Sequence, residues 1–312
     1  MKIFSWITKD TTIDFLKARK LCYVLSLLLI AASIASIAVK GFNYGIDFSG
    51  GALIEVRSKN GPVDVEKVRT QLSQLKLDEL TLQSVGDSNE QLMIRAQANN
   101  ADEESQRIAV NKIKDLLAGE FTFERIESVG PQVGKELKLS GILASVFACI
   151  AISLYIWFRF EWRFALGALL GLFHDLLITV GLLSMFHMEF SLTTIAAILT
   201  LAGYSVNDTV VTYDRIRENL QKYRKMPQYD LLNKSINDIL SRTILTSLTT
   251  LFASVSLLVL GGDALRSFAF VITAGVVIGT YSSIYVSTAL LNCFDLHKAA
   301  SEDKDVNPFG NV

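Results

Sequence analysis

The stretch GYSVNDTVVTYDRIREN, residues 203–219, decides what kind of protein this sequence encodes. It ends a mostly apolar run, 190–213, in which no charged residue precedes Asp208. At about 1.5 Å per residue, a helix of this length crosses a hydrocarbon core of about 30 Å. The stretch therefore predicts a membrane-spanning helix that carries a carboxylate within it.

Five other apolar runs of similar length accompany this one. The chain has 312 residues, half of them hydrophobic, with a positive mean hydropathy and a net charge of −1. A soluble domain can be as apolar, so the distribution decides the class. Runs near the length of about 20 residues that a span needs cover 21–39, 139–158, 164–186, 190–213, 243–260 and 267–291. The sequence predicts an α-helical integral membrane protein with six transmembrane helices, five of them in a bundle over 139–292.

The first run, 21–39, also has features of a cleaved signal peptide, because basic residues precede it and small residues fill its end. Its length exceeds the usual signal core of about 7–15 residues, which favours an uncleaved anchor. Lysine and arginine concentrate in 1–20, 159–163 and 214–242. The positive-inside rule then predicts cytoplasmic termini, 1–20 and 293–312, and a cytoplasmic loop at 214–242.

Residues 40–138 lie between the first two predicted helices and are expected on the outer side of the membrane; the family resemblance below implies that this is the periplasm. Strand patterns are found at 51–57, 80–86, 90–96 and 121–130, and helical patterns at 62–76, which starts with proline, and 102–117. The residues DSN at 87–89 predict a hairpin turn. The order β-α-β-β-α-β predicts an α+β domain of the ferredoxin-like type. The domain has no histidine, cysteine or acidic cluster, which favours a binding or coupling module over an enzyme.

Two glycine-containing segments flank this domain. FNYGIDFSGG, residues 42–51, lacks the Gly-Lys-Ser/Thr ending of a phosphate-binding loop and the helix that should follow. SVGPQVGKEL, residues 128–137, returns the chain to the membrane. We predict turns or hinges at their glycines and proline, which are Gly45, Gly50, Gly51, Gly130, Pro131 and Gly134.

Two carboxylates lie within predicted spans, where a charge costs about 2.5–3.5 kcal/mol on insertion scales. Asp175 follows His174 near the middle of its span, and Asp208 lies closer to the cytoplasmic end of the next one. Ser205, Asp208 and Thr209 share one helical face at i, i+3 and i+4, flanked by Asn207. This spacing predicts a polar stripe around Asp208.

Polar stripes on two further spans accompany this one. Arg242, Thr246 and Thr249 share a face of the fifth span, and Thr280, Ser283 and Ser287 share a face of the sixth. Because neighbouring spans are antiparallel, Asp208 and Arg242 are expected at similar depth, where they can pair. A carboxylate whose arginine approaches and withdraws binds a proton with an affinity that depends on conformation.

Helix packing is the alternative explanation for these polar residues, and the sequence leaves it open for the serine and threonine stripes. The GxxxG pairs Gly167/Gly171 and Gly275/Gly279 favour close packing of helices outright. The three cysteines, Cys22, Cys149 and Cys293, have no metal-ligand spacing and imply no disulfide framework. We therefore expect no metal site and no cofactor.

Several motifs resemble the SecD/SecF family of bacterial protein-export membrane proteins, and its SecF branch in particular. FNYGIDFSGG and SVGPQVGKEL are followed in the family's order by FEWRFALGALLGLFHD (160–175), GYSVNDTVVTYDRIREN, RTILTSLTTL (242–251) and ITAGVVIGTYSSIYVS (272–287). Together they extend over residues 42–287. Six spans with a periplasmic domain after the first are also the family architecture.

The resemblance implies an inner-membrane accessory of the SecYEG channel that uses the proton-motive force to help unfolded preproteins emerge. It implies SecD as a partner that supplies a homologous six-helix half, and surrounding lipid but no nucleic acid as contacts. The family's proton-path acid matches Asp208, and its gating arginine matches Arg242. Sodium coupling stays open. We expect protonation of Asp208 to weaken its pairing with Arg242, and 40–50 and 130–138 to transmit the movement outward.

Three other functions would each account for part of this pattern. An intramembrane aspartyl protease would need both acids at one depth and a Gly-x-Gly-Asp motif, whereas this sequence has Ser205-Val206-Asn207-Asp208. A proton-driven exporter of small molecules, built like the RND transporters to which the family is related, would need a ligand pocket in the outer domain. A structural scaffold leaves the intramembrane carboxylate unexplained. We expect no enzymatic activity.

Overall fold

The computed structural model describes residues 11–75, 79–85, 89–97 and 103–296, which form two compact units. The helical unit comprises Met1–Phe42, Ser145–Met188 and Thr193–Val312. The α/β unit comprises Asn43–Ala144 together with Glu189–Leu192, a segment between the third and fourth long helices. A short piece that follows the third span therefore belongs to the α/β unit.

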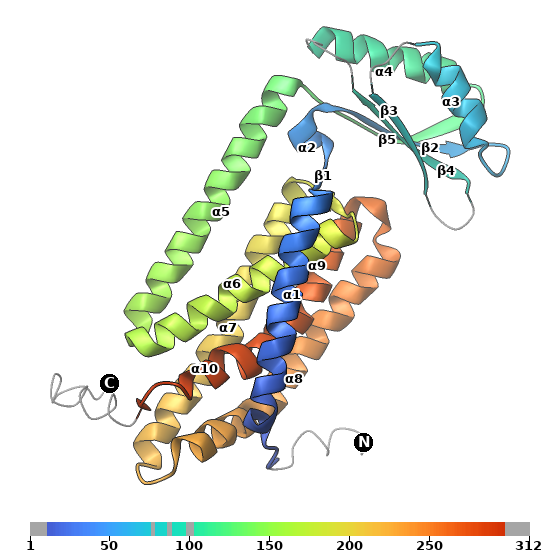
Figure 1. Ribbon diagram of the computed structural model, residues 1–312. Helices are drawn as coiled ribbons and strands as arrows, with labels where there is room; N and C mark the ends of the chain where they lie inside the picture. Colours follow the sequence, from blue (N-terminus) through green and yellow to red (C-terminus); the bar gives the residue numbers. More distant parts are fainter. Residues whose placement is uncertain (1–10, 76–78, 86–88, 98–102, 297–312) are drawn as a thin grey trace. The chain divides into compact units, whose positions relative to one another are not determined.

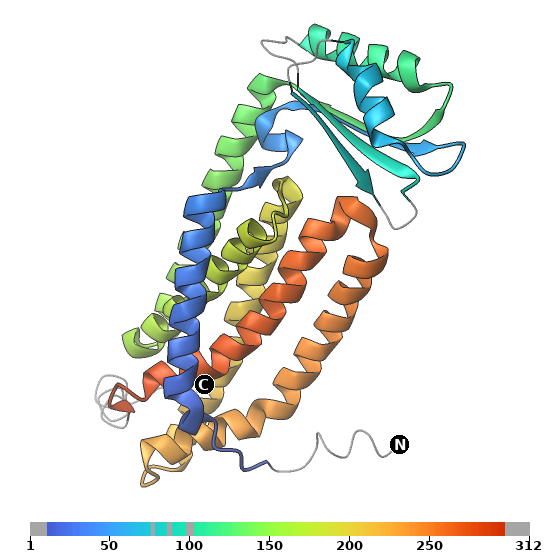
Figure 2. The same cartoon turned by 45° about the vertical axis from the view of Figure 1, so that its right-hand side comes forward.

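Within the described residues, six helical segments are long and apolar enough to cross a membrane, in agreement with the predicted number of spans (Figure 1). The 3-10 turn η2 (Phe15–Ala18) leads into α1 (Arg19–Lys40). The others are α5 (Pro131–Arg159), α6 (Trp162–Met185), α7 (Leu192–Lys222), α8 (Gln228–Leu260), and α9 (Gly262–Ser282) with the π-helical turn η3 (Ser283–Thr288) and α10 (Ala289–Leu291). Figure 2 shows α8 and α9 side by side, as their contacts require.

The predicted loop at 214–242 is wrong, because α7 continues to Lys222 and α8 begins at Gln228. Buried apolar side chains explain the extra turns. Ile216 and Leu220 of α7 pack in one core with Leu231 and Leu232 of α8. The charged residues of this segment lie on the other faces of these amphipathic helices. In sequence, so many charged residues in a short stretch suggest a loop.

The first turns of α8 hold segments from both ends of the described chain. Asn233 accepts a hydrogen bond from the Leu16 backbone N–H at 3.0 Å, and Asn237 bonds both backbone groups of Ile13. Gln228 donates to the carbonyls of Leu291 and Phe294 and accepts from the Leu296 N–H. These amide side chains fix the start of α1 and the end of the α9–η3–α10 segment against one helix.

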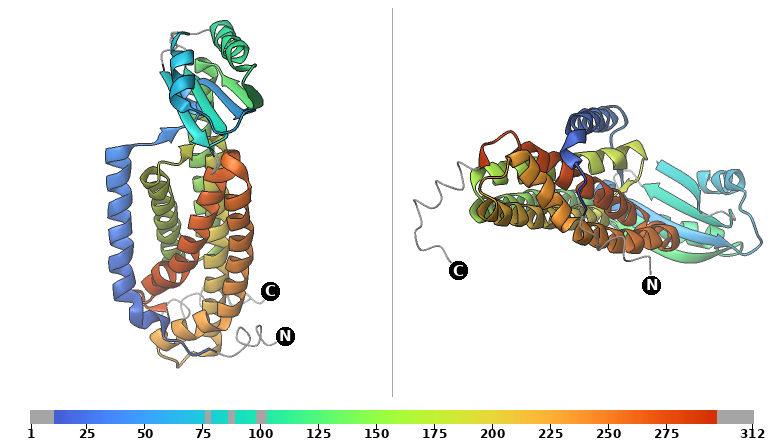
Figure 3. Two further views of the ribbon diagram at one scale, coloured as in Figure 1. Left: turned by 90° about the vertical axis from the view of Figure 1, so that its right-hand side faces the viewer. Right: turned by 90° about the horizontal axis from the view of Figure 1, so that it is seen from below.

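Small residues bring α1 against α6. Within α1, which is described throughout, only Ser26 and Ser33 are buried. Ser33 contacts Gly181 of α6 so closely that a side chain at Gly181 would clash with it, and the hydroxyls of Ser36 and Ser184 lie 3.1 Å apart. The remaining faces of α1 are largely exposed, and Figure 3 shows the helix at the edge of the bundle.

The GxxxG glycines also lie at close helix contacts. A Cβ atom at Gly171 would clash with Ser287, and one at Gly275 would clash with Leu201. A Cβ atom at Gly167 would lie 2.5 Å from the Tyr213 hydroxyl oxygen. At Gly279 it would lie 3.5 Å from a carboxylate oxygen of Asp175 and 3.6 Å from Cβ of Ser205, so this glycine leaves room beside the polar centre.

The α/β unit contains the elements β2 (Gly51–Ser58), α3 (Val65–Ser73), β3 (Glu79–Val85), β4 (Gln91–Gln97), α4 (Glu103–Leu117) and β5 (Phe121–Val129). They form one antiparallel sheet with the strand order β3-β4-β2-β5. Figures 1 and 2 show α3 and α4 on one face of this sheet. Residues 87 and 88 of the predicted hairpin turn lie outside the described residues, and Asn89 has a φ of +51°.

Alternating apolar residues supply the core of this unit. Ala52, Ile54 and Val56 of β2 pack with Val68 and Leu72 of α3, and with matching residues of β4 and α4. The first helix begins at Val65 rather than at Pro62, because Asp64 accepts hydrogen bonds from the backbone N–H groups of Glu66 and Lys67 and caps the helix.

Candidate functional site

Asp208 is half-buried in the middle of α7, and hydroxyl groups hold its carboxylate. Ser283, the first residue of the π-helical turn, donates to Oδ2 at 2.5 Å, and Thr243 of α8 donates to Oδ1 at 3.2 Å. Ser283 has a second acceptor, the Thr280 carbonyl oxygen at 3.1 Å. Its single proton can therefore turn away from Asp208 when that carboxyl group carries a proton of its own.

Asp175 of α6 is fully buried and has three partners. Ser205 of α7 donates to Oδ2 at 2.6 Å, and Ser282 of α9 donates to the same oxygen at 2.7 Å. The other oxygen lies 2.8 Å from Nδ1 of His174. A buried carboxylate with this many partners belongs to a built polar site, since a bare charge would be very costly there.

The two carboxylates are bridged by neighbouring residues. Ser205 and Asp208 are one turn apart on α7, while Ser282 and Ser283 are adjacent where α9 changes into a π-helix. The side-chain hydroxyl of Thr288, the last residue of the π-helical turn, donates to the Ser283 carbonyl at its start. Such turns are frequent at functional sites. Here the turn points successive hydroxyls at Asp175 and Asp208.

Arg242 forms no ion pair with Asp208 in this arrangement of the bundle, so their pairing stays a prediction. The arginine side chain is exposed, and within the described part of the chain it forms no ion pair. The reason is its position on α8. Thr243 faces inward and donates to Asp208, so the preceding residue lies about 100° away around the helix and points outward.

The predicted stripe on α8 lies on this outward face. Thr246 and Thr249 are exposed, and they donate to backbone carbonyls of their own helix, those of Arg242 and Leu245 among others. Together with Asp238, Ser241 and Leu245 they line a surface hollow of about 520 Å³ beside Arg242. On α7, Thr209 is buried and Asn207 is exposed. Of the predicted coupling residues, the structure thus brings together Ser205, Asp208 and Asp175.

Sequence reasoning missed Ser282 and Thr243 as partners of the two acids. Ser283 was assigned to a polar stripe, without a partner. The sequence feature that indicates these contacts is the pair Ser282 and Ser283 in TYSSIYVS, residues 280–287. It follows Gly279, a residue small enough to leave room for Asp175. Thr280, in the same predicted stripe, instead lies 2.7 Å from the hydroxyl of Ser247 on α8.

A joint within the α/β unit holds the first turn of α7. The two-residue strand β1 (Asn43–Tyr44) pairs in parallel with β6 (Glu189–Phe190), and Gly45 donates from its backbone N–H to the Phe190 carbonyl at 2.9 Å. Asp47, in the short helix α2 (Ile46–Ser49), accepts from the Leu192 N–H at 2.9 Å. The residues around Gly45 are thus bonded to the segment that starts α7.

Glu189 adds a charged contact to this joint. Its carboxylate lies 3.2 Å from Arg95 of β4, and a side chain at Gly45 would clash with it. Burial raises the pKa of Glu189 above its ordinary value, and the positive charge of Arg95 opposes that rise.

The other predicted hinge residues lie in the same unit and are tightly packed. Gly50 and Gly51 have positive φ angles of 72° and 117°, which favour glycine. A Cβ atom at Gly134 would lie 3.2 Å from the Gly50 backbone nitrogen. Gly130 precedes Pro131, the first residue of α5. This geometry shows a close crossing of two chain segments.

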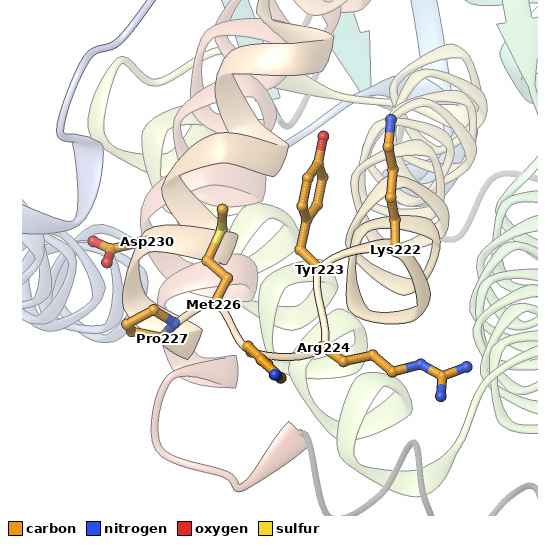
Figure 4. A pocket seen from close by; sticks show the side chains of 7 residues that line it. Lys222, Tyr223, Arg224, Met226, Pro227 and Asp230 are labelled. Carbon is orange, nitrogen blue, oxygen red and sulfur yellow. The ribbon is translucent and has the colours of Figure 1, made fainter.

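Another surface hollow, of about 660 Å³, lies at the turn between α7 and α8 (Figure 4). It is lined by Lys222, Tyr223, Arg224, Lys225, Met226, Pro227 and Asp230. The arginine side chain points away from the tyrosine and the methionine, so the basic groups do not converge on one point. Among the described residues, no cluster of histidine, cysteine and acidic side chains could hold a metal ion.

Two family models match the sequence. Residues 109–297 match "Protein export membrane protein SecD/SecF, C-terminal", and residues 35–61 match "SecD/SecF GG Motif". The chain is 44% identical over 283 residues to the protein translocase subunit SecF of Rickettsia rickettsii, covering 90% of this chain and 91% of that one. It is 46% identical over 287 residues to the SecF of Cereibacter sphaeroides, covering 89% and 88%.

Solved structures agree with these matches. The crystal structure of SecDF, a translocon-associated membrane protein from Thermus thermophilus, superposes with a TM-score of 0.80 at 39% identity, covering 91% of this chain. A SecDF structure in a super-membrane-facing form gives a TM-score of 0.67 at 37% identity, covering 95%. The chain spans 39% and 40% of those longer chains. It is a multi-pass membrane protein, and it belongs to the SecD/SecF family of protein-export membrane proteins.

Proposed function

We propose that this protein is an accessory subunit of the bacterial protein-export machinery that, together with SecD, couples the proton-motive force to late preprotein translocation. The observation that carries the proposal is the environment of Asp208. Its carboxylate lies inside a membrane-spanning helix, is held by two hydroxyls, and forms no ion pair in the described part of the chain. Such a group can bind and release a proton.

The Ser283 hydroxyl allows both protonation states. When Asp208 is charged, Ser283 donates to it, and when Asp208 is protonated, the acid donates to Ser283 while the serine proton turns to Thr280. Each proton that crosses the membrane supplies about 2.3 kcal/mol per 100 mV. This is enough to bias two arrangements of the bundle that differ by a few kcal/mol.

Arg242 takes part in the second arrangement. It neighbours Thr243 on α8, so a rotation of this helix by about 100° exchanges the hydroxyl for the guanidinium at Asp208. The exposed face around Arg242 is then the surface that SecD covers or that moves during the cycle. Ser205, Asn207, Thr209, Thr246 and Asp175 complete the polar path in this proposal.

The joint around Asp47 and Glu189 transmits the movement. Because α7 carries Asp208 and begins on these residues, displacement of α7 reaches the α/β unit through them. A second connection is the close contact between Gly50 and Gly134, next to Gly130 and Pro131. Gly45 and Gly51 lie on either side of the segment that contains Asp47. These glycines act as hinges in the proposal.

We assign the α/β unit the ferredoxin-like fold. The parallel pair β2 and β3 is split by β4, and the parallel pair β4 and β5 is split by β2, as expected of two interleaved βαβ halves. The unit lies in the periplasm in this proposal, with both termini in the cytoplasm and the chain in the inner membrane. There it contacts unfolded preprotein near SecYEG, and we assign it no enzymatic activity.

Preprotein translocation in inverted membrane vesicles tests this function. The vesicles carry SecD with the wild-type protein or with Asp208→Asn, and ATP is depleted after initiation, with or without a proton gradient. We expect the gradient to complete translocation only with Asp208 intact. Asp214→Asn is the matched control, because this acid lies on the same helix in an ion pair with Arg159. Full gradient-driven completion with Asp208→Asn would disprove the coupling role.

A further inference from the structure

A buried chain of hydrogen bonds leads from Asp175 to α1. His174 Nδ1 lies 2.8 Å from Asp175, and its Nε2 lies 3.0 Å from the hydroxyl of Ser26. The Ser26 hydroxyl lies 3.0 Å from that of Tyr281, which donates to the backbone carbonyl of Cys22 at 2.7 Å. Asp175, His174 and Ser26 are 0%, 5% and 6% exposed, so water does not supply alternative partners.

We propose that His174 and Asp175 form a second proton-binding site, and that its occupancy decides which group of α1 accepts from Tyr281 of α9, the Cys22 carbonyl or the Ser26 hydroxyl oxygen. The proposal deepens the proposed function and rests on it for its biological purpose. The proton-binding state itself is argued from the hydrogen bonds alone.

The direction of the chain follows from counting protons. A carbonyl oxygen can only accept a hydrogen bond, so the Tyr281 hydroxyl donates its proton to the Cys22 carbonyl. The Tyr281 oxygen then accepts from the Ser26 hydroxyl. Ser26 has one proton, which is now in use. Its oxygen must accept from His174 Nε2, and that nitrogen therefore carries a hydrogen.

The protonation of the pair follows. With Nε2–H fixed, Nδ1 either accepts from a protonated Asp175 or is itself protonated and donates to a carboxylate. Both forms hold one proton more than a carboxylate beside a neutral imidazole. Both also keep the pair electrically neutral as a whole, which a fully buried site requires. In this proposal the chain of hydrogen bonds described above is the arrangement that holds the proton.

Loss of that proton reverses the chain. Nδ1–H then donates to the carboxylate, and Nε2 accepts from Ser26, which no longer donates to Tyr281. Tyr281 regains a partner by turning from the Cys22 carbonyl of α1 to the Ser26 oxygen. The titratable side chains that face the pair or its chain are Asp208 of α7, Tyr281 of α9 and Cys22 of α1, and Tyr285 of η3 stacks on Tyr281 with ring centroids 5.5 Å apart. Among these described groups none is a cation that would replace the proton.

Nitrogen-15 NMR of histidine in bilayer-reconstituted full-length protein tests the proposal. The chain has three histidines, so His187→Gln and His297→Gln leave His174 as the single signal. At near-neutral pH we expect a protonated Nε2. Ser26→Ala and Tyr281→Phe remove the directional constraint, and each should shift the population about fivefold toward the neutral Nδ1–H form, as expected for one hydrogen bond of average strength. Tyr285→Phe is the matched control, because it also removes a tyrosine hydroxyl. This hydroxyl has no hydrogen-bond partner in the described part of the chain, so the His174 spectrum should not change.

A neutral Nδ1–H form in the wild type would overturn the proton-binding site. Unchanged spectra in both Ser26→Ala and Tyr281→Phe would overturn the coupling to α1. Asp208→Asn should leave the His174 spectrum with a protonated Nε2, because the chain of hydrogen bonds does not include Asp208. Failure of gradient-driven export to depend on Asp208 would therefore disprove the proposed function without changing this result.

Discussion

The carboxylate of Asp47 accepts a hydrogen bond from the backbone N–H of Leu192 at 2.9 Å. Leu192 is the first residue of α7, and Asp208 follows sixteen residues later, about 24 Å along the helix. The helix that carries the intramembrane acid is therefore capped by a residue of the segment that matches the SecD/SecF GG motif. A negative side chain also suits the positive end of the helix dipole.

Asp47→Ala should loosen the first turn of α7. Loss of a capping side chain costs about 1 kcal/mol, which corresponds to about fivefold faster local opening. Hydrogen exchange of the Leu192 amide measures this directly. Asp47→Asn keeps an acceptor at the same position and should exchange at close to the wild-type rate. Equal exchange in the wild type and in Asp47→Ala would show that the cap does not hold the helix.

Glu189 should make the joint weaker as the pH rises. Burial raises the pKa of Glu189 in the folded protein above its ordinary value of 4.5, with Arg95 opposing the rise. A group whose pKa is higher in the folded than in the unfolded state stabilises the fold fully below the unfolded value. This stabilisation is lost as the pH rises through the folded value.

The Gly45 amide, which donates to Phe190 across the joint, reports this effect. We expect its protection factor, corrected for the intrinsic exchange rate, to fall from about pH 4 to about pH 7 in the wild type. Glu189→Gln cannot ionise and should flatten the profile. A profile that is identical in the variant would assign the pH dependence to another group.

Much of this fold follows from local patterns. Apolar runs predicted six spans, and alternation in 51–57 and 90–96 predicted strands whose apolar residues form the core. The extension of α7 and α8 through 214–242 was missed because charged faces hide the buried stripe of Ile216 and Leu220. Periodicity identifies an amphipathic helix only when the apolar face outweighs the charges.

The polar centre was predictable only in part. The spacing of Ser205 and Asp208 places both on one face of α7, as the structure has them. Spacing within one helix does not fix the rotation of the next, so the sequence did not indicate that Thr243 of α8 bonds to Asp208. The π-helical turn also changes the residue count per turn. Ser282, the last residue of α9, and Ser283, the first residue of this turn, donate to different acids.

Gly181→Ala should destabilise the contact of α1 with α6. The added methyl group would clash with the backbone and side chain of Ser33, and overpacking of this kind costs about 1–3 kcal/mol. Thermal unfolding in detergent should show a lower melting temperature. Gly203→Ala is the matched control, because no atom lies within 4 Å of the added group. There the better helix propensity of alanine should leave stability unchanged or slightly raised. Equal melting temperatures for both variants would argue against close packing at Gly181.

Arg242 and Asp208 should couple only weakly in the resting protein, where they attract each other without a hydrogen bond or an ion pair, and strongly in export. Arg242 is exposed and Asp208 is bonded to Ser283 and Thr243. The changes in melting temperature for Arg242→Gln and Asp208→Asn should therefore nearly add in the double variant. If the two side chains meet during the transport cycle, either substitution alone should abolish most gradient-driven translocation, and the second should add little. Arg224→Gln, a basic residue of the α7–α8 turn, controls for the loss of a positive charge. Additive losses in export would show that the two residues act separately, whereas strongly non-additive melting temperatures would show that they already pair at rest.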